Sequence, residues 1–171
     1  EVDATRRVDA IHKILRCLDC FVDPYPIDGG CDEGPSYWGR AGASLFDCLE
    51  LLHKASDGAI DLYDEPLIAD IGRFIYRVHI GGDDYINFAD APAIVTPDAA
   101  LVHAYGHAID DEPMQQHGAA LATRYAGRSS ANVDLGRRLR QLTSAKDLAA
   151  KTGASPLPRD VWLDQIQVMV A

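Results

Sequence analysis

The residues best suited to chemistry lie in one loop, whose sequence at positions 28–39 is DGGCDEGPSYWG. Tyr37 is the leading candidate for a catalytic group, because a tyrosine hydroxyl can hand a proton directly to a departing oxygen. Acting as a base would require a nearby cation or hydrogen-bond donor, and Arg40 is close enough in the chain to help. The alternative is an ordinary tyrosine whose hydroxyl bonds to the backbone.

The side chains around Tyr37 each have two interpretations. Asp32 and Glu33 suggest a glycosidase pair, but adjacent residues usually point apart, and that chemistry needs two carboxyl groups on opposite sides of the sugar. They either face a substrate or cap the helix that follows, where carboxylates interact well with the helix dipole. Trp38 either stacks on a sugar ring or packs in the core. Glu33, Trp38 and Arg40 are therefore our candidate substrate-binding residues.

Histidines and cysteines make a weaker case for a metal or redox site. His103 and His107 are one helical turn apart, as a metal pair would be, but no glutamate follows the first histidine and no third ligand is evident. A metalloenzyme is a third hypothesis, and we assign no metal ligand. Cys17 and Cys20 have the spacing of a redox or metal half-site without a second half, so we expect buried thiols. A disulfide or a zinc site is the alternative.

The composition narrows the classes of partner. The 171 residues, 47% of them hydrophobic, are enough for one domain with a real core. Sixteen Lys and Arg against 26 Asp and Glu give a net charge of -10, which disfavours nucleic acid and anionic membranes. No apolar run is long enough to predict a membrane span. The localisation stays open, whether bacterial periplasm, cytoplasm or secretion.

The apolar pattern predicts an all-α fold. Apolar residues recur at helical spacing, with proline or glycine at most joints. The expected helices cover residues 3–20, 40–54, 65–79, 97–109, 113–126, 132–143 and 144–151, and residues 83–92 form a second ordered loop. This rhythm predicts stacked antiparallel helical hairpins, as in a solenoid or a toroid. Only residues 165–171 alternate like a β-strand, with no partner strand evident.

The loop at 28–39 resembles the D-G-x-x-x-E-G-x-x-Y-W loop of the heparinase II/III-like polysaccharide lyases. The stretch GDDYINFADA at 82–91 also looks like a loop of that family. Members of the family join an incomplete (α/α) toroid to a C-terminal antiparallel β-sandwich, and they cleave uronic-acid-containing polysaccharides by β-elimination. The resemblance implies that residues 1–171 are a single helical domain, the C-terminal part of such a toroid. Residues 165–171 would begin a missing β-sandwich.

By the same resemblance, Tyr37 matches the family tyrosine that serves as acid and, in some members, also as base. Glu33 and Trp38 match positions that shape or line the sugar cleft. The family's carboxylate-neutralising Asn or His precedes this loop, and its other catalytic histidine lies in the β-sandwich, so we expect neither in this chain.

The resemblance therefore implies a fragment of a polysaccharide lyase, that is, of a carbon-oxygen lyase. Its expected partners are an acidic polysaccharide or oligosaccharide and the missing β-sandwich, with no cofactor and little or no activity alone. The alternative, of a different class, is a noncatalytic helical module that binds carbohydrate or protein through Trp38 and the acidic loop.

Overall fold

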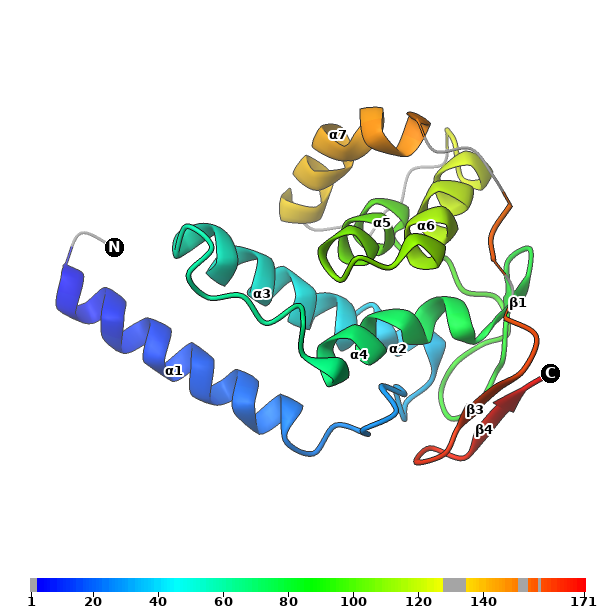
Figure 1. The fold of residues 1–171 in the computed structure, drawn as a ribbon, viewed down its shortest axis with the longest axis horizontal. Coiled ribbons are helices and arrows are strands. Elements are labelled where there is room, and N and C mark those ends of the chain that lie inside the picture. Colours follow the sequence, from blue (N-terminus) through cyan, green and yellow to red (C-terminus); the bar gives the residue numbers. More distant parts are fainter. Residues whose placement is uncertain (1–2, 128–134, 151–153, 157) are drawn as a thin grey trace.

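The computed structural model describes residues 3–127, 135–150, 154–156 and 158–171, and these are predominantly helical (Figure 1). The prediction of a mostly helical fold is confirmed, and none of the described helices is long and apolar enough to cross a bilayer. The helices are α1 (Ala4–Val22), α2 (Pro35–Trp38), α3 (Gly42–Ala55), α4 (Pro66–Arg77), α5 (Ala99–Ala108), α6 (Glu112–Arg124) and α7 (Leu135–Ala150). Two antiparallel hairpins pair β1 (His79–Gly81) with β2 (Asp84–Tyr85) and β3 (Val161–Leu163) with β4 (Val168–Val170).

Local chemistry sets the helix starts. The Asp3 carboxylate accepts hydrogen bonds from the first N–H groups of α1, and Asp98 and Asp111 do the same for α5 and α6. These caps satisfy donors that have no partner within the helix. Pro66 occupies the start of α4, where its missing N–H costs nothing. The observed starts therefore lie close to the expected ones.

The core is centred on α4 and α5. Ile71, Phe74 and Ile75 of α4 are completely buried. Tyr105 of α5 is also completely buried, and its hydroxyl donates a 2.7 Å hydrogen bond to the carbonyl oxygen of Ile68. The Tyr105 ring stacks on Phe46 of α3, with ring centroids 4.5 Å apart. One aromatic side chain thus ties three helices together.

Ion pairs attach α7 to α3. The Arg137 guanidinium donates to the Asp47 carboxylate at 2.8 Å, and Arg140 binds both Asp47 and Glu50. The helices expected over 132–143 and 144–151 are one helix within the described residues, because nothing at 144 interrupts the backbone. The expected positions 132–134 and 151 lie outside the described residues.

The expected burial of Cys17 and Cys20 is wrong, since both thiols are exposed on α1. No residue of this helix is fully buried. Leu18 and Val22 pack partly against the core, but the N-terminal part of the apolar stripe is open to solvent, with Ile14 52% exposed. Figure 1 shows α1 along one side of the molecule with its N-terminal half reaching away from the body. Helical periodicity predicts an apolar face but does not show that another element covers it.

The ends of two predicted elements also need correction. The helix expected to reach His79 ends at Arg77, and His79 begins β1. This strand pairs with β2, which lies in the second ordered loop expected at 83–92. The terminal strand does have a partner, β3, with Leu163 opposite Val168. A three-residue strand carries too little alternation to be recognised from its sequence.

Candidate functional site

Residues 28–34, which we call the glycine loop, are held by backbone contacts that only glycine allows. Gly29 has φ +74°, and an added Cβ would lie 2.2 Å from the backbone carbon of Asp70. Gly34 has φ +96°, and an added Cβ would lie 2.5 Å from the Ala91 side chain. L side chains rarely adopt this backbone conformation, and neither position has room for one. The glycine loop is therefore seated tightly on α4 and on the segment before α5.

Trp38 anchors the other side of the site. It ends the one-turn helix α2, is 1% exposed, and its indole N–H donates a 2.7 Å hydrogen bond to the carbonyl oxygen of Ile71. The ring stacks on Tyr105 with centroids 6.4 Å apart. The packing alternative is thus the one observed, and a ring without an exposed face offers nothing to a sugar. Trp38 is not carried forward as a substrate-binding residue.

Tyr37 lies between these two anchors and is half-buried. Its backbone N–H bonds to the carbonyl oxygen of Gly34 at 3.1 Å, and its own carbonyl accepts from Arg40 and Ala41. In the parts of the chain that the structure describes, no hydrogen bond to the Tyr37 hydroxyl is found. The backbone of Tyr37 is therefore fixed while its hydroxyl remains available.

The charged candidates lie on the surface at the two ends of this segment. Asp32, Glu33 and Arg40 are all exposed. Neither carboxylate caps α2, whose N-cap is Gly34 and has no side-chain hydrogen bond. The capping alternative is therefore not observed, and a substrate-facing role stays a prediction for Glu33 and Arg40.

Cys31, in the glycine loop, is a packed thiol. It is 2% exposed, and burial raises its pKa to about 11. A cysteine attacks or binds metal as the thiolate, which this site disfavours near neutral pH. Cys31 is therefore not a nucleophile candidate.

The histidine pair on α5 does not make a metal centre. His103 is 6% exposed, whereas His107 is exposed in the last turn of the helix. Across residues 3–127, 135–150, 154–156 and 158–171, no group of three or more His, Cys, Asp or Glu side chains is placed to hold a metal ion. The pair gives no support to the metalloenzyme hypothesis.

A second polar cluster, which the sequence did not reveal, joins Tyr85, His117, Ser155 and His79. The Tyr85 hydroxyl lies 3.1 Å from Nε2 of His117, and Nδ1 of His117 lies 2.6 Å from Oγ of Ser155. Ser155 Oγ is also 3.4 Å from Nδ1 of His79. His79 and Ser155 line a hollow of about 280 Å³ together with Gly82 and Arg124. The hydrogen-bonded pairs in this cluster are 32, 38 and 76 residues apart, so no local spacing predicts these bonds.

The direction of the hydrogen bonds in this histidine cluster follows from one carbonyl. Gly82 O can only accept, so the His79 Nε2–H donates to it at 3.0 Å, and Nδ1 of His79 is an acceptor. The single Ser155 proton has two acceptors at 3.4 Å, Nδ1 of His79 and the carbonyl oxygen of Pro156. When it goes to either, Ser155 accepts from the His117 Nδ1–H, which leaves Nε2 of His117 to accept from Tyr85. This arrangement satisfies both ring nitrogens of His117 with the imidazole neutral.

Burial agrees with that assignment for His117, which is completely buried. Desolvation lowers its pKa to about 3, and the neighbouring His79 contributes in the same direction. A neutral His117 is the form that the hydrogen bonds require. The cluster is therefore a link between the helical body and the segment before β3.

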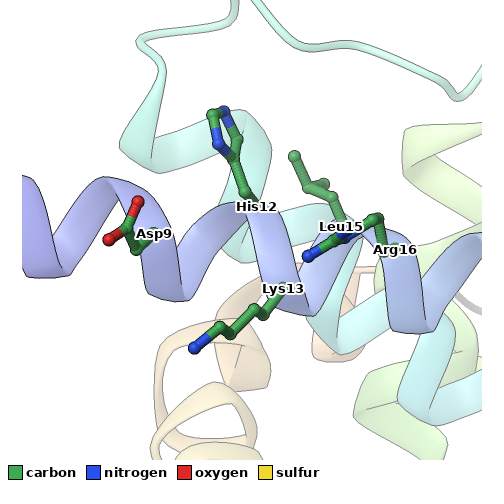
Figure 2. Close-up of a pocket in the computed structure, with 5 residues that line it drawn as sticks. All are labelled: Asp9, His12, Lys13, Leu15 and Arg16. Carbon is green, nitrogen blue, oxygen red and sulfur yellow. The ribbon is translucent and has the colours of Figure 1, made fainter.

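A larger hollow, of about 430 Å³, lies on α1. Figure 2 shows its lining residues, Asp9, His12, Lys13, Leu15 and Arg16, which all come from that helix, with the Lys13 ammonium pointing away from the His12 ring. Two permanent cations against one carboxylate make this a locally positive surface on a chain of net charge -10. Tyr37 lines neither this hollow nor the one at His79.

No protein-family model matches the chain, and no curated protein gives a significant match. Function must therefore be inferred from the residues of the chain itself.

Proposed function

We propose that this chain is part of a polysaccharide lyase that cleaves uronic-acid-containing polysaccharides by β-elimination, with Tyr37 as the acid. In this proposal the helices belong to an incomplete (α/α) toroid, and other segments of a longer polypeptide supply the remaining catalytic groups. The resemblance of residues 28–39 to the loop of the heparinase II/III-like lyases supports the proposal.

The observation that carries the proposal is the setting of Tyr37. Its hydroxyl has no hydrogen-bond partner among the described residues, while the backbone on both sides is held by Gly34 and Trp38. A catalytic group must be positioned before the substrate arrives, since misplacement by about 1 Å can cost about a hundredfold in rate. Fixed backbone and an available hydroxyl are what a proton donor needs.

The elimination needs a base, a neutralised carboxylate and an acid. The base removes the proton from the carbon next to the uronate carboxylate, and a carbon–carbon double bond forms as the bond to the glycosidic oxygen breaks. Tyr37 donates its phenolic proton to that oxygen, and the resulting phenolate recovers a proton from solvent or from the base.

The net charge of -10 would repel an anionic substrate, and an exposed cation near Tyr37 would offset this repulsion locally. Arg40 is exposed three residues after Tyr37, with no ion pair in the described part of the chain. Most arginines of α7 are unsuited to this task because Arg137 and Arg140 are already bound to Asp47 and Glu50. Arg40 is therefore the residue of this chain that we assign to an auxiliary contact with the anionic sugar, and we assign Glu33 to the sugar hydroxyls.

The test uses the full-length polypeptide that contains this chain, assayed on glycosaminoglycans, alginate and other polyuronates. The readout is the ultraviolet absorbance of the conjugated double bond in the unsaturated product. Tyr37→Phe removes only the hydroxyl and is expected to lower kcat by about 10²- to 10⁴-fold. Tyr63→Phe is the matched control, because Tyr63 is also half-buried but packs against Phe46 and His53.

Full activity in Tyr37→Phe would refute the assignment of the acid. Saturable binding of polyuronates by the wild type without any unsaturated product would instead favour the noncatalytic binding module.

A further inference from the structure

The β3–β4 hairpin contacts the glycine loop through one carboxylate. Oδ2 of Asp28 accepts hydrogen bonds from the backbone N–H groups of Gln165 at 2.7 Å and Ile166 at 3.2 Å, in the turn of the hairpin. Oδ1 of the same side chain accepts from the N–H of Gly30 at 2.9 Å. Asp28 therefore satisfies donors on the loop and on a turn 137 residues away at the same time.

Side chains of the hairpin turn also contact the glycine loop and the residue before it. The Gln165 side-chain oxygen accepts from the backbone N–H of Ile27, just before the loop. Ile166 covers Gly30, where an added Cβ would lie 2.5 Å from the end of the isoleucine side chain. Polar and apolar contacts thus join the same two segments.

The hairpin is itself held by the core, so it is a firm support. Leu163 of β3 is 2% exposed and Val170 of β4 is 7% exposed, and both belong to the main hydrophobic core. Figure 1 shows β3 and β4 beside each other at the end of the chain. Displacing the hairpin turn from Asp28 would require exposing one of these anchors or bending the turn.

We propose that Asp28 and Gln165 are positioning residues for Tyr37, and that the C-terminal hairpin is part of the lyase site. The inference rests on the proposed function for its catalytic consequence. The glycine loop leads directly into α2, so its far end sets where the helix starts and where the Tyr37 hydroxyl points. The contacts at Gly34 and Trp38 support the later part of this segment, and Asp28 together with Gly29 supports its beginning.

The number of donors explains why aspartate stands at this position. Three N–H groups on two segments need acceptors on both oxygens. Asparagine keeps one acceptor oxygen, and alanine keeps none. The loosening of the glycine loop and the loss of kcat should therefore be larger in Asp28→Ala than in Asp28→Asn.

The experiment measures amide hydrogen exchange and lyase kinetics in the full-length polypeptide. Asp28→Ala and Gln165→Ala are compared with Asp64→Ala, which removes an exposed carboxylate from a different turn. We expect exchange across residues 29–37 to accelerate about tenfold to a hundredfold in Asp28→Ala, with a smaller change in Gln165→Ala, and no change in α5. We expect kcat to fall at least about tenfold with a smaller rise in KM, since the loosened segment includes Glu33 as well as Tyr37.

Unchanged exchange at 29–37 in both variants would overturn the proposal, as would a wild-type kcat in both. If Asp28→Ala fails to fold, Gln165→Ala decides, because it removes one reciprocal bond and no buried group. The exchange result does not depend on activity, so it holds even if no polyuronate is cleaved. Loss of activity in Tyr37→Phe together with wild-type kinetics in Asp28→Ala would leave the proposed function standing and refute the positioning role.

Discussion

Acidification is expected to destabilise the fold through His117. This imidazole is completely buried, and the groups that face it are His79 after α4, Tyr76 of α4, Tyr85 of β2 and Ser155 before β3. Burial, and then the nearby His79, lower the pKa of His117 to about 3. None of these neighbours carries a negative charge that would compensate an imidazolium.

The sign and the size of this change in stability follow from the pKa of His117 in the folded and in the unfolded chain. In the unfolded chain a histidine has a pKa of about 6.5. Below that pH the unfolded state therefore binds a proton that His117 in the folded state does not bind. Stability is therefore present above the unfolded pKa and is lost as the pH falls toward the folded one. The loss is about 1.4 kcal/mol per pH unit, which gives about 2 kcal/mol between about pH 7 and pH 5. The folded pKa of about 3 lies well below this range.

The assay is urea unfolding at several pH values for the wild type, His117→Asn and His107→Asn. The amide N–H of asparagine can replace the Nδ1–H donor to Ser155 without titrating. Between about pH 7 and pH 5 the wild type should lose about 2 kcal/mol more than His117→Asn, while the exposed His107 should make little difference. Equal pH dependence in the wild type and His117→Asn would refute a buried neutral histidine.

Two further predictions test the glycine loop and α1. Gly29→Ala should lower the free energy of unfolding by about 2–4 kcal/mol, because the backbone is left-handed and the new Cβ would press against Asp70. Gly58→Ala is the control and should cost only about 1 kcal/mol, because its φ is similar, +80°, but its nearest contact is 3.7 Å away. Similar urea midpoints for the two variants would contradict the close packing at Gly29. A thiol reagent should modify the exposed Cys17 and Cys20 rapidly in the native state and Cys31 only on unfolding, as read by mass spectrometry. Fast labelling of Cys31 in the native state would contradict its burial and its raised pKa of about 11.

The helices of this protein are legible in its sequence because their determinants are local. Asp98 and Asp111 precede apolar periodic segments and cap them, and Pro66 begins α4. The shape of the glycine loop also has a local basis, since Gly29 and Gly34 adopt positive φ angles that glycine permits. The polar character of residues 28–39 identified the candidate site for the same reason, as all its members are neighbours in the chain.

The sequence did not decide which of those members reach solvent. Tyr37 and Trp38 are adjacent aromatic residues, yet one is half-buried with an available hydroxyl and the other is sealed between Ile71 and Tyr105. Which side of a one-turn helix faces the core depends on where α4 and α5 lie. The N-terminal part of α1 shows the converse, because Val8, Ile11 and Ile14 have the spacing of a core helix but are exposed.

Local pattern therefore determined the helices, the turns and the set of residues in the loop, since these depend on neighbours within a few positions. Long-range packing alone brought Gln165 to Asp28 and Ser155 to His117, because these pairs are 137 and 38 residues apart and no local pattern marks them. The contacts that support the glycine loop and hold His117 neutral exist only once α4, α6 and the β3–β4 hairpin have packed together.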